Sequence, residues 1–250
     1  MKYPHTPLIF GHRGASAYAP ENTLAAFELA ADMGADGVEF DVQISKDGQL
    51  IIHHDRVLGR TEEAAGPLAQ WTFADLRALD VGSWFDARFA GQRMPTPDEL
   101  VDAVGERLLL NFELINDSWQ LNGVGPGLVA LFRRRNLFRR AMISSFNPRA
   151  LWQVKKMEPR ITIGALWGPN EPWLVRSGLM RRLLRPQALH PRHDLVTPRL
   201  VAAAHDRGQR VNTWTVNDAE TAKRMLDAGV DLLMGDAPDL LLRATEGNDA

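Results

Sequence analysis

Apolar residues recur along the chain in two alternating spacings. Short apolar runs are typical of buried strands, whereas segments with an apolar residue at every third or fourth position are typical of helices. The predicted strands are residues 8–10, 38–42, 108–113, 141–146, 162–167, 188–190, 210–216 and 230–234. Helical spacing separates nearly all of them. This order predicts parallel strands in an α/β fold, and about eight units favour a closed (β/α)8 TIM barrel over an open sheet with a second domain.

Capping residues mark where the predicted helices begin. A Thr, Asn or Asp before a helix can accept backbone N–H groups of its first turn, and proline suits the first helical position. The predicted helix starts are residues 20–22, 96–97, 147–148, 197–198, 218 and 238. Gly34, Gly208 and Gly229 are the predicted stops.

The second strand is expected to turn back on itself, because Asp47-Gly48 is a strong hairpin signal. A two-residue turn would place Asp41 opposite His54. A three-residue turn would select His53 instead. The sequence leaves both registers open.

Residues 56–93 lose this periodicity and predict a small insertion after the second strand, with short helices such as 72–79. A plain surface loop is one interpretation. Three aromatic residues, Trp84, Phe85 and Phe89, favour a packed, cap-like segment instead.

Residues 169–192 interleave leucines and tryptophan with arginines. A basic amphipathic helix can lie on a membrane surface, but it more often packs against its own domain with solvated arginines. We favour internal packing and keep peripheral lipid contact through residues 170–186 as a second hypothesis. Residues 245–250 are expected to form a frayed tail.

Length and composition narrow the class of protein. The 250 residues match the size of one barrel domain over residues 1–250, and 45% hydrophobic with 24% charged residues is ordinary for a globular chain. With a net charge of −2, the chain lacks the overall positive charge that non-specific nucleic-acid binding requires. A protein that acts on small molecules is therefore the favoured class. The first apolar run is too short for a secretory signal or a membrane span, which predicts a cytoplasmic protein without stable membrane insertion.

Polar side chains gather where the first predicted strands end. The strand at 8–10 runs directly into His12 and Arg13 between two glycines. Glu39 and Asp41 alternate with apolar residues and therefore share one face of the second strand, while Glu113 ends the third. Active sites of such barrels lie at these carboxyl ends, so the groups are expected to converge.

Three carboxylates in a chain without cysteine predict an oxygen-ligated divalent cation, Mg²⁺ or Ca²⁺. A single carboxylate is more often part of an ion pair or a helix cap. That interpretation weakens for Glu39 and Asp41, because two lone charges facing the barrel interior would be costly. Histidine as a residue type suits proton transfer near neutral pH, and His12 and His54 each have acidic neighbours, so the two fit an acid/base pair.

These motifs together resemble those of the glycerophosphodiester phosphodiesterases. The specific ones are HRG, PENTLAAF, the E-x-D of VEFDVQISKDG and the histidine-aspartate of IIHHD. Weaker matches follow in LNFEL at 110–114, ISSFNP at 143–148, VNTWTVND at 211–218 and GVDLLMGDAPD at 229–239. The resemblance therefore spans nearly the whole chain.

The resemblance implies metal-dependent hydrolysis of a small-molecule glycerophosphodiester to an alcohol and sn-glycerol 3-phosphate. It implies that the substrate's glycerol hydroxyl attacks phosphorus, giving a cyclic phosphate that water opens. The insertion would cover the barrel mouth. The implied roles are metal ligation by Glu39, Asp41 and Glu113, acid/base catalysis by His12 and His54, and neutralisation of phosphate charge by Arg13. Which histidine is the acid stays open.

Two positions qualify this resemblance. Trp214 matches a tryptophan that lines the glycerol pocket in the family, although packing at the barrel rim explains it equally well. The family's lysine two residues after the third-strand glutamate is replaced by Ile115, which removes a cation that would face the phosphate. Two rivals follow: a lysophospholipase D using the same groups on lipid substrates, and a non-catalytic phosphoglycerol-binding protein.

Overall fold

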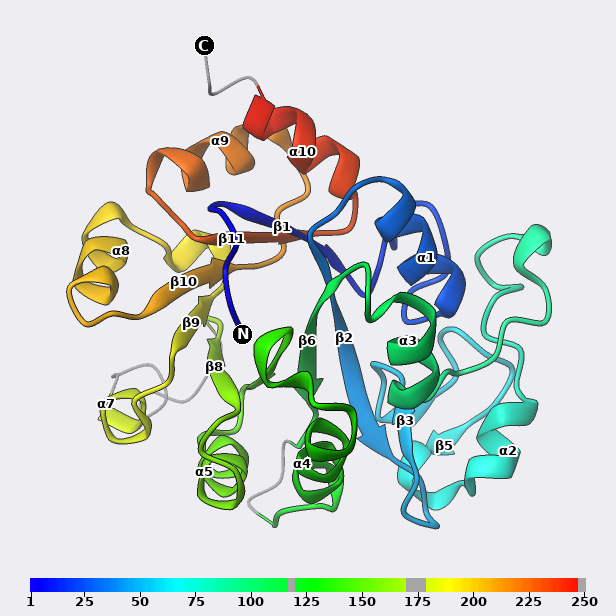
Figure 1. Cartoon of the computed structure of the whole chain (residues 1–250). Coiled ribbons are helices and arrows are strands. Elements are labelled where there is room, and N and C mark those ends of the chain that lie inside the picture. Colours follow the sequence, from blue (N-terminus) through cyan, green and yellow to red (C-terminus); the bar gives the residue numbers. More distant parts are fainter. Residues whose placement is uncertain (117–119, 170–178, 247–250) are drawn as a thin grey trace.

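The computed structural model describes residues 1–116, 120–169 and 179–246 and contains a closed barrel of parallel strands (Figure 1). Closure is made by β1, which pairs in parallel with both β2 and β11. The barrel strands are β1 (Leu8–His12), β2 (Gly37–Ile44), β6 (Leu109–Leu114), β7 (Ala141–Ser145), β8 (Thr162–Trp167), β9 (Ala188–Pro191), β10 (Arg210–Thr213) and β11 (Leu232–Gly235). The predicted (β/α)8 barrel is confirmed.

Helices surround the strands as an outer layer (Figure 1). They are α1 (Leu24–Asp32), α3 (Pro97–Val104), α4 (Val124–Arg135), α5 (Pro148–Met157), α7 (Leu179–Leu184), α8 (Pro198–His205), α9 (Ala219–Asp227) and α10 (Pro238–Glu246), with short 3-10 helices η3 (Leu137–Arg139) and η4 (His193–Leu195). The predicted caps Thr96, Asn147, Thr197 and Asp218 all accept a backbone N–H of the first turn.

Two predicted boundaries were wrong. Helix α1 begins at Leu24, capped by Thr23, so residues 20–22 belong to the loop that precedes it. Strand β10 ends at Thr213, short of the predicted end at residue 216. Beyond it, Trp214 forms an isolated β-bridge to Arg192.

The hairpin after β2 has the longer of the two turns considered. Strand β3 (Leu50–Ile52) pairs antiparallel with β2, Val42 facing Ile52. Gly48 has φ of 82°, the left-handed conformation that a three-residue hairpin loop requires, and Asp47 accepts from Phe73 N at 2.8 Å. The two-residue turn was therefore wrong, and His53, not His54, faces Asp41 across the ladder, donating its N–H to the Asp41 carbonyl at 3.0 Å.

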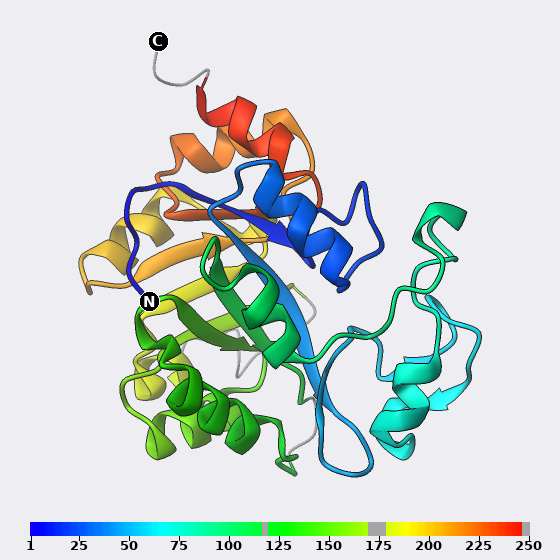
Figure 2. The same cartoon turned by 45° about the vertical axis from the view of Figure 1, so that its right-hand side comes forward.

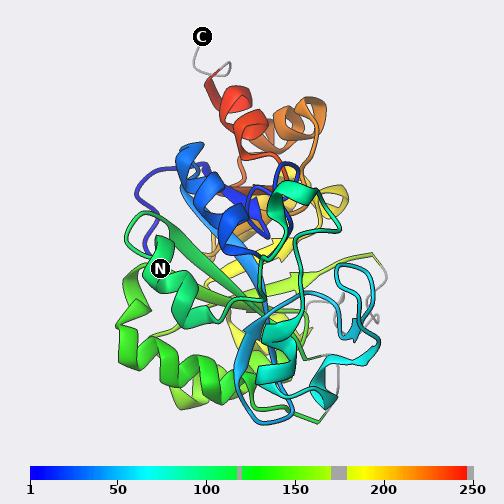
Figure 3. The ribbon, with the colours of Figure 1, turned by 90° about the vertical axis from the view of Figure 1, so that its right-hand side faces the viewer.

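The insertion after β3 projects from the barrel wall (Figures 2 and 3). It contains β4 (Val57–Leu58), β5 (Gly66–Pro67), η1 (Leu68–Gln70), α2 (Phe73–Ala78) and η2 (Ala87–Phe89), and α2 confirms the helix expected at 72–79. Its own apolar cluster includes Leu58, Leu68 and Leu76. The three aromatic residues expected to pack it stack on one another outside this cluster, and Trp84 is 43% exposed.

Only part of the basic segment at 169–192 can be assigned, since residues 170–178 lie outside the described residues. Within α7, Leu184 packs into the main apolar cluster, whereas Leu183 is 73% exposed. Helix α10 extends to Glu246, past Thr245 where a frayed tail was expected to begin, and residues 247–250 are not described. No helix of the described chain has the length and apolarity needed to span a membrane.

Alternation along β2 and β6 separates the core from the polar interior. Phe40 and Phe112 point outward and lie between Phe27 of α1 and Phe132 of α4, with ring centroids 4.5 to 5.7 Å apart from neighbour to neighbour. Because successive strand residues face opposite sides, the intervening residues point into the barrel. The outward apolar ladder thus fixes the inward direction of Glu39, Asp41 and Glu113.

A neutral histidine is buried inside the barrel. His190 of β9 is fully buried, and its Nε2 lies 2.9 Å from Asn212 Nδ2, which therefore donates to it. Gly164 makes room for the ring, since a Cβ there would lie 2.5 Å from His190 Nε2. Burial lowers the pKa of His190 to about 3, because the charged imidazolium would lose its hydration.

This burial predicts acid sensitivity. Between pH 6.5 and about 3 the unfolded chain binds a proton at His190 that the folded chain does not, so stability falls as pH decreases through this window. From pH 8 to pH 5 we expect His190 to reduce the free energy of unfolding by about 2 kcal/mol. Denaturant unfolding of wild type and His190→Gln at both pH values measures this difference. Equal pH dependence in the two proteins would contradict it.

Candidate active site

A tight loop after β1 presents the first pair of candidate groups. Arg13 has φ of 56° and Gly14 φ of 85°, and a Cβ on Gly14 would lie 2.7 Å from the Ala26 backbone. Only glycine meets both requirements at position 14. The loop leaves His12 beside Glu39, its register partner on β2.

The three predicted metal ligands come together at the carboxyl ends of β2 and β6. Asp41 and Glu113 are register partners, and one oxygen from each of Glu39, Asp41 and Glu113 lies within 4.8 Å of the others. Glu39 and Asp41 are buried, 3% and 2% exposed. Glu39 Oε1 has no hydrogen-bond partner within the described chain. An all-oxygen set with a buried, unused acceptor fits a hard cation such as Mg²⁺ or Ca²⁺.

Neighbouring groups offset part of the negative charge. Arg13 donates its backbone N–H to Glu39 Oε2 at 3.2 Å, and its Nε lies 3.2 Å from Asp41 Oδ2. Asn22 donates to Asp41 Oδ2 at 2.9 Å. Burial and the Asp41 charge still raise the pKa of Glu39 to about 7, against the opposing effects of His12 and Arg13.

His12 is held by a carboxylate that directly follows the last strand of the barrel. Its Nδ1 donates to Asp236 Oδ1 at 2.7 Å, and its Nε2 lies 4.0 Å from Glu39 Oε2. Burial alone would lower the pKa of His12, but the Asp236 hydrogen bond and the Glu39 charge outweigh it and raise that pKa. Asp236 was missed as a site residue, although it directly follows β11 and so obeys the same strand-end rule as the others.

His54 also has a carboxylate bound to its Nδ1, but this carboxylate comes from the next residue in the chain. Its Nδ1 donates to Asp55 Oδ1 at 2.7 Å, and its side chain is 39% exposed. Arg60 Nε binds Asp55 Oδ2 at 2.5 Å, and both Arg60 and Arg13 bind Glu21. Although burial opposes the shift, these arginines lower the pKa of Glu21 to about 2. A hydrogen bond to Asp55 and the ion pairs of Arg60 and Glu21 thus connect His54 to Arg13, a link that the sequence did not reveal.

His53 faces the insertion instead of the barrel mouth. It is 5% exposed, and its Nε2 lies 3.7 Å from Glu62 Oε2. Burial lowers the pKa of His53. Although the register sets His53 opposite Asp41, His54 is the accessible imidazole of the two.

Trp214 lies at the barrel rim after β10. Its indole N–H donates to the His190 carbonyl at 3.0 Å, and its ring meets Phe146 edge-on at 5.5 Å. These contacts agree with packing at the rim, and a role of Trp214 in a glycerol pocket stays a prediction. Ile115 directly follows β6, its N–H donating to the Val42 carbonyl at 3.1 Å.

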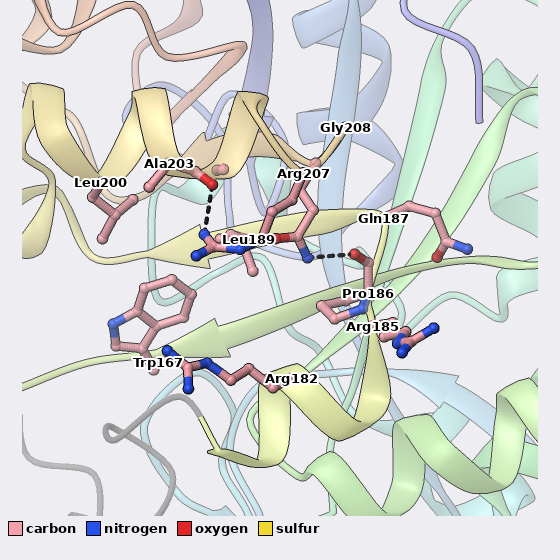
Figure 4. Close-up of a pocket in the computed structure, with 12 residues that line it drawn as sticks. Trp167, Arg182, Arg185, Pro186, Gln187, Leu189, Leu200, Ala203, Arg207 and Gly208 are labelled. Carbon is pink, nitrogen blue, oxygen red and sulfur yellow. Dashed lines mark hydrogen bonds between the residues drawn. The ribbon is translucent and has the colours of Figure 1, made fainter.

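A separate cavity of about 730 Å³ lies outside the barrel, between β8, β9 and α8 (Figure 4). Trp167, Leu189 and Leu200 supply apolar lining, and Arg182 and Arg185 supply charge. None of the candidate catalytic or metal-binding residues lines this cavity. The candidate catalytic groups and this cavity are therefore separate features of the barrel.

A (β/α)8 barrel with a carboxylate cluster and two histidines gathered at its strand ends is the architecture of a barrel enzyme whose active site lies at that end. Residues 12–240 match the model of the glycerophosphoryl diester phosphodiesterase family, and the chain belongs to this family. It is 37% identical to the glycerophosphodiester phosphodiesterase of Caldanaerobacter subterraneus subsp. tengcongensis, over 94% of this chain and 96% of that protein.

Other relatives agree. The glycerophosphodiester phosphodiesterase of Bacillus altitudinis is 31% identical, over 95% of this chain and 98% of that protein. The structure of an Oleispira antarctica phosphodiesterase in complex with the product sn-glycerol-3-phosphate superposes with a TM-score of 0.87 at 29% identity, covering 96% of this chain and 97% of that one.

The raised pKa of Glu39 predicts that cation binding is coupled to proton release. Cations bind the carboxylate form, which grows as pH rises through about 7. We expect affinity for Mg²⁺ or Ca²⁺ to rise about tenfold from pH 6 to pH 8. Titration calorimetry in two buffers of different ionisation enthalpy counts the released protons, with Glu39→Gln as the control that removes the linkage. Affinity independent of pH would refute the coupling.

Proposed function

We propose that the protein hydrolyses glycerophosphodiesters to an alcohol and sn-glycerol 3-phosphate, using a divalent cation held by Glu39, Asp41 and Glu113. The observation that carries this proposal is the placement of His12 beside that cluster, with its Nδ1 bound to Asp236 and its Nε2 4.0 Å from Glu39. The relative from Oleispira antarctica, bound to sn-glycerol-3-phosphate, supports the same product.

The two histidines divide the proton transfers in this proposal. In the first step one imidazole accepts the proton of the attacking glycerol hydroxyl, and the other donates a proton to the leaving alcohol oxygen. In the second step the roles reverse: water loses a proton as it attacks the cyclic phosphate, and the glycerol oxygen that leaves phosphorus takes a proton back. Because Asp236 and Asp55 each accept from Nδ1, they hold both rings in the tautomer whose Nε2 is free to exchange a proton.

Positive charge is needed because the anionic oxygens of a phosphodiester repel a nucleophile. A bound divalent cation would supply part of that charge. Arg13 adds a guanidinium at the edge of the cluster, where Glu21 and Asp41 fix its orientation. With Ile115 in place of the family's lysine, Arg13 takes a larger share of phosphate recognition in this chain.

The decisive assay is release of glycerol 3-phosphate from glycerophosphocholine and glycerophosphoethanolamine. We expect EDTA to abolish the rate and Mg²⁺ or Ca²⁺ to restore it. Glu39→Ala and His54→Ala should each lower kcat at least about a hundredfold, because they remove a cation ligand and a proton-transfer group. His205→Ala, at a half-exposed histidine on α8, is the control and should keep the wild-type rate.

Two outcomes would contradict the proposal. A folded protein that binds glycerol 3-phosphate but releases none from either substrate would be a binding protein. Full activity in EDTA would remove the cation from the mechanism while leaving hydrolysis in place.

A lipid substrate is the second candidate, favoured by the surface of α7. Leu183 is 73% exposed, and Arg182 and Arg185 lie beside it at the apolar cavity. Exposed leucine with flanking arginines suits the interface of an anionic membrane. In this reading the same site would act as a lysophospholipase D.

Substitution at Leu183 tests lipid contact. Leu183→Gln should abolish co-sedimentation with phosphatidylglycerol vesicles and leave the rate on glycerophosphocholine unchanged. Val57→Gln is the matched control, because Val57 is also exposed, at 62%, but lies in the insertion. Vesicle binding that is absent in wild type, or unchanged in Leu183→Gln, would exclude α7 as a lipid contact.

A further inference from the structure

One buried side-chain amide binds three consecutive carbonyl groups around His54. Gln43 Nε2 lies 2.8 Å from the His53 carbonyl oxygen, 3.1 Å from that of His54 and 3.0 Å from that of Asp55. An amide nitrogen has only two N–H groups, so the three acceptors share them. The three carbonyls must therefore curve around a single point.

This contact replaces strand pairing at the place where the chain leaves the sheet. Strand β3 ends at Ile52, and the His53 N–H still binds the Asp41 carbonyl of β2, whereas the carbonyls of residues 53–55 lie beyond the regular ladder. Gln43 lies two residues after Asp41 and four after Glu39 on β2, so all three share a face of that strand. Gln43 is 7% exposed, which keeps water from competing for the carbonyls.

We propose that Gln43 is a positioning residue that fixes the His54 imidazole relative to the carboxylate cluster. The inference rests on the proposed function, in which His54 transfers a proton. Glu39 and Asp41, two of the proposed cation ligands, then lie on the same strand as Gln43, which holds His54. The regular repeat of that strand sets the spacing between them. The side chain of His54 is oriented by its neighbour Asp55, so holding the backbone of both residues places the whole pair.

Misplacement by about 1 Å can cost a hundredfold in rate, because proton transfer requires hydrogen-bond reach. Removing the Gln43 amide should therefore lower kcat. KM and cation affinity should change less than about twofold, since Glu39, Asp41, Glu113 and Arg13 remain in place. A merely structural amide would instead lower the fraction of folded protein, and rate and cation-binding stoichiometry would fall together.

A double-mutant cycle with His54→Ala separates these roles. Gln43→Met removes the donors at similar volume, and Gln43→Asn keeps an amide too short to reach all three carbonyls. In the wild-type background we expect either variant to lower kcat about ten- to a hundredfold. Here kcat is calculated from the concentration of folded enzyme, which is counted by its cation-binding stoichiometry. In the His54→Ala background, assayed at high enzyme concentration, the same substitution should change the residual rate less than twofold. Gln209→Met, which removes an amide donating to the Pro186 carbonyl at 2.8 Å, is the remote control and should leave kcat unchanged in both backgrounds.

The outcomes are distinct. Equal fold losses in both backgrounds would show that Gln43 acts independently of His54 and overturn the inference. So would a wild-type kcat in a folded Gln43 variant when His54→Ala is inactive. Full activity in His54→Ala would overturn the proposed role of His54 itself. If Gln43→Met does not fold, the cycle is decided with Gln43→Asn.

Discussion

The structure depends on two carboxylates of one strand, Glu39 and Asp41, buried together inside the barrel. Such a pair is unfavourable in isolation, because each charge loses hydration and repels the other. Arg13, Asn22 and His12 reduce that cost, and the unused oxygen of Glu39 leaves a place for a cation to remove it. The loop after β1 therefore stabilises the buried carboxylates of β2 and also carries candidate functional groups of the site.

Side chains on alternate faces of β2 serve the apolar core on one side and the candidate site on the other. Phe40, between Glu39 and Asp41, is fully buried against Phe27 and Phe112 outside the barrel. If the register of β2 shifted by one residue, its side chains would exchange faces. The two carboxylates would then face the apolar helices, and Phe40 would point into the polar mouth of the barrel. Packing of the outward phenylalanines thus selects the strand register, and the same register points Glu39 and Asp41 into the barrel.

Sequence patterns predicted what is set locally. Period-two spacing gave the face of Glu39 and Asp41, and capping residues located most helix starts. The partners of these groups could not be read this way, because Asp236 reaches His12 from 224 positions along the chain. The hairpin register depended on the conformation of Gly48 and on Asp47 binding a residue of α2, and neither is visible as periodicity. The role of Trp84, Phe85 and Phe89 was also mispredicted, because the buried cluster of the insertion is formed mainly by aliphatic residues such as Leu58, Leu68 and Leu76.

The two histidines show how one chemical arrangement arises from different parts of the fold. His12 ends a strand paired on both sides, and Asp236 reaches it across the same barrel closure. Ser16 and Asn217 also donate to the Asp236 carboxylate, so the sheet and two side chains together hold that pair. His54 lies past the end of β3 and takes its carboxylate from the next residue, so its orientation is local but its position is not fixed by the sheet. On the His54 side the anchor comes from β2 itself, where Gln43 binds the backbone at the point at which it departs from the barrel.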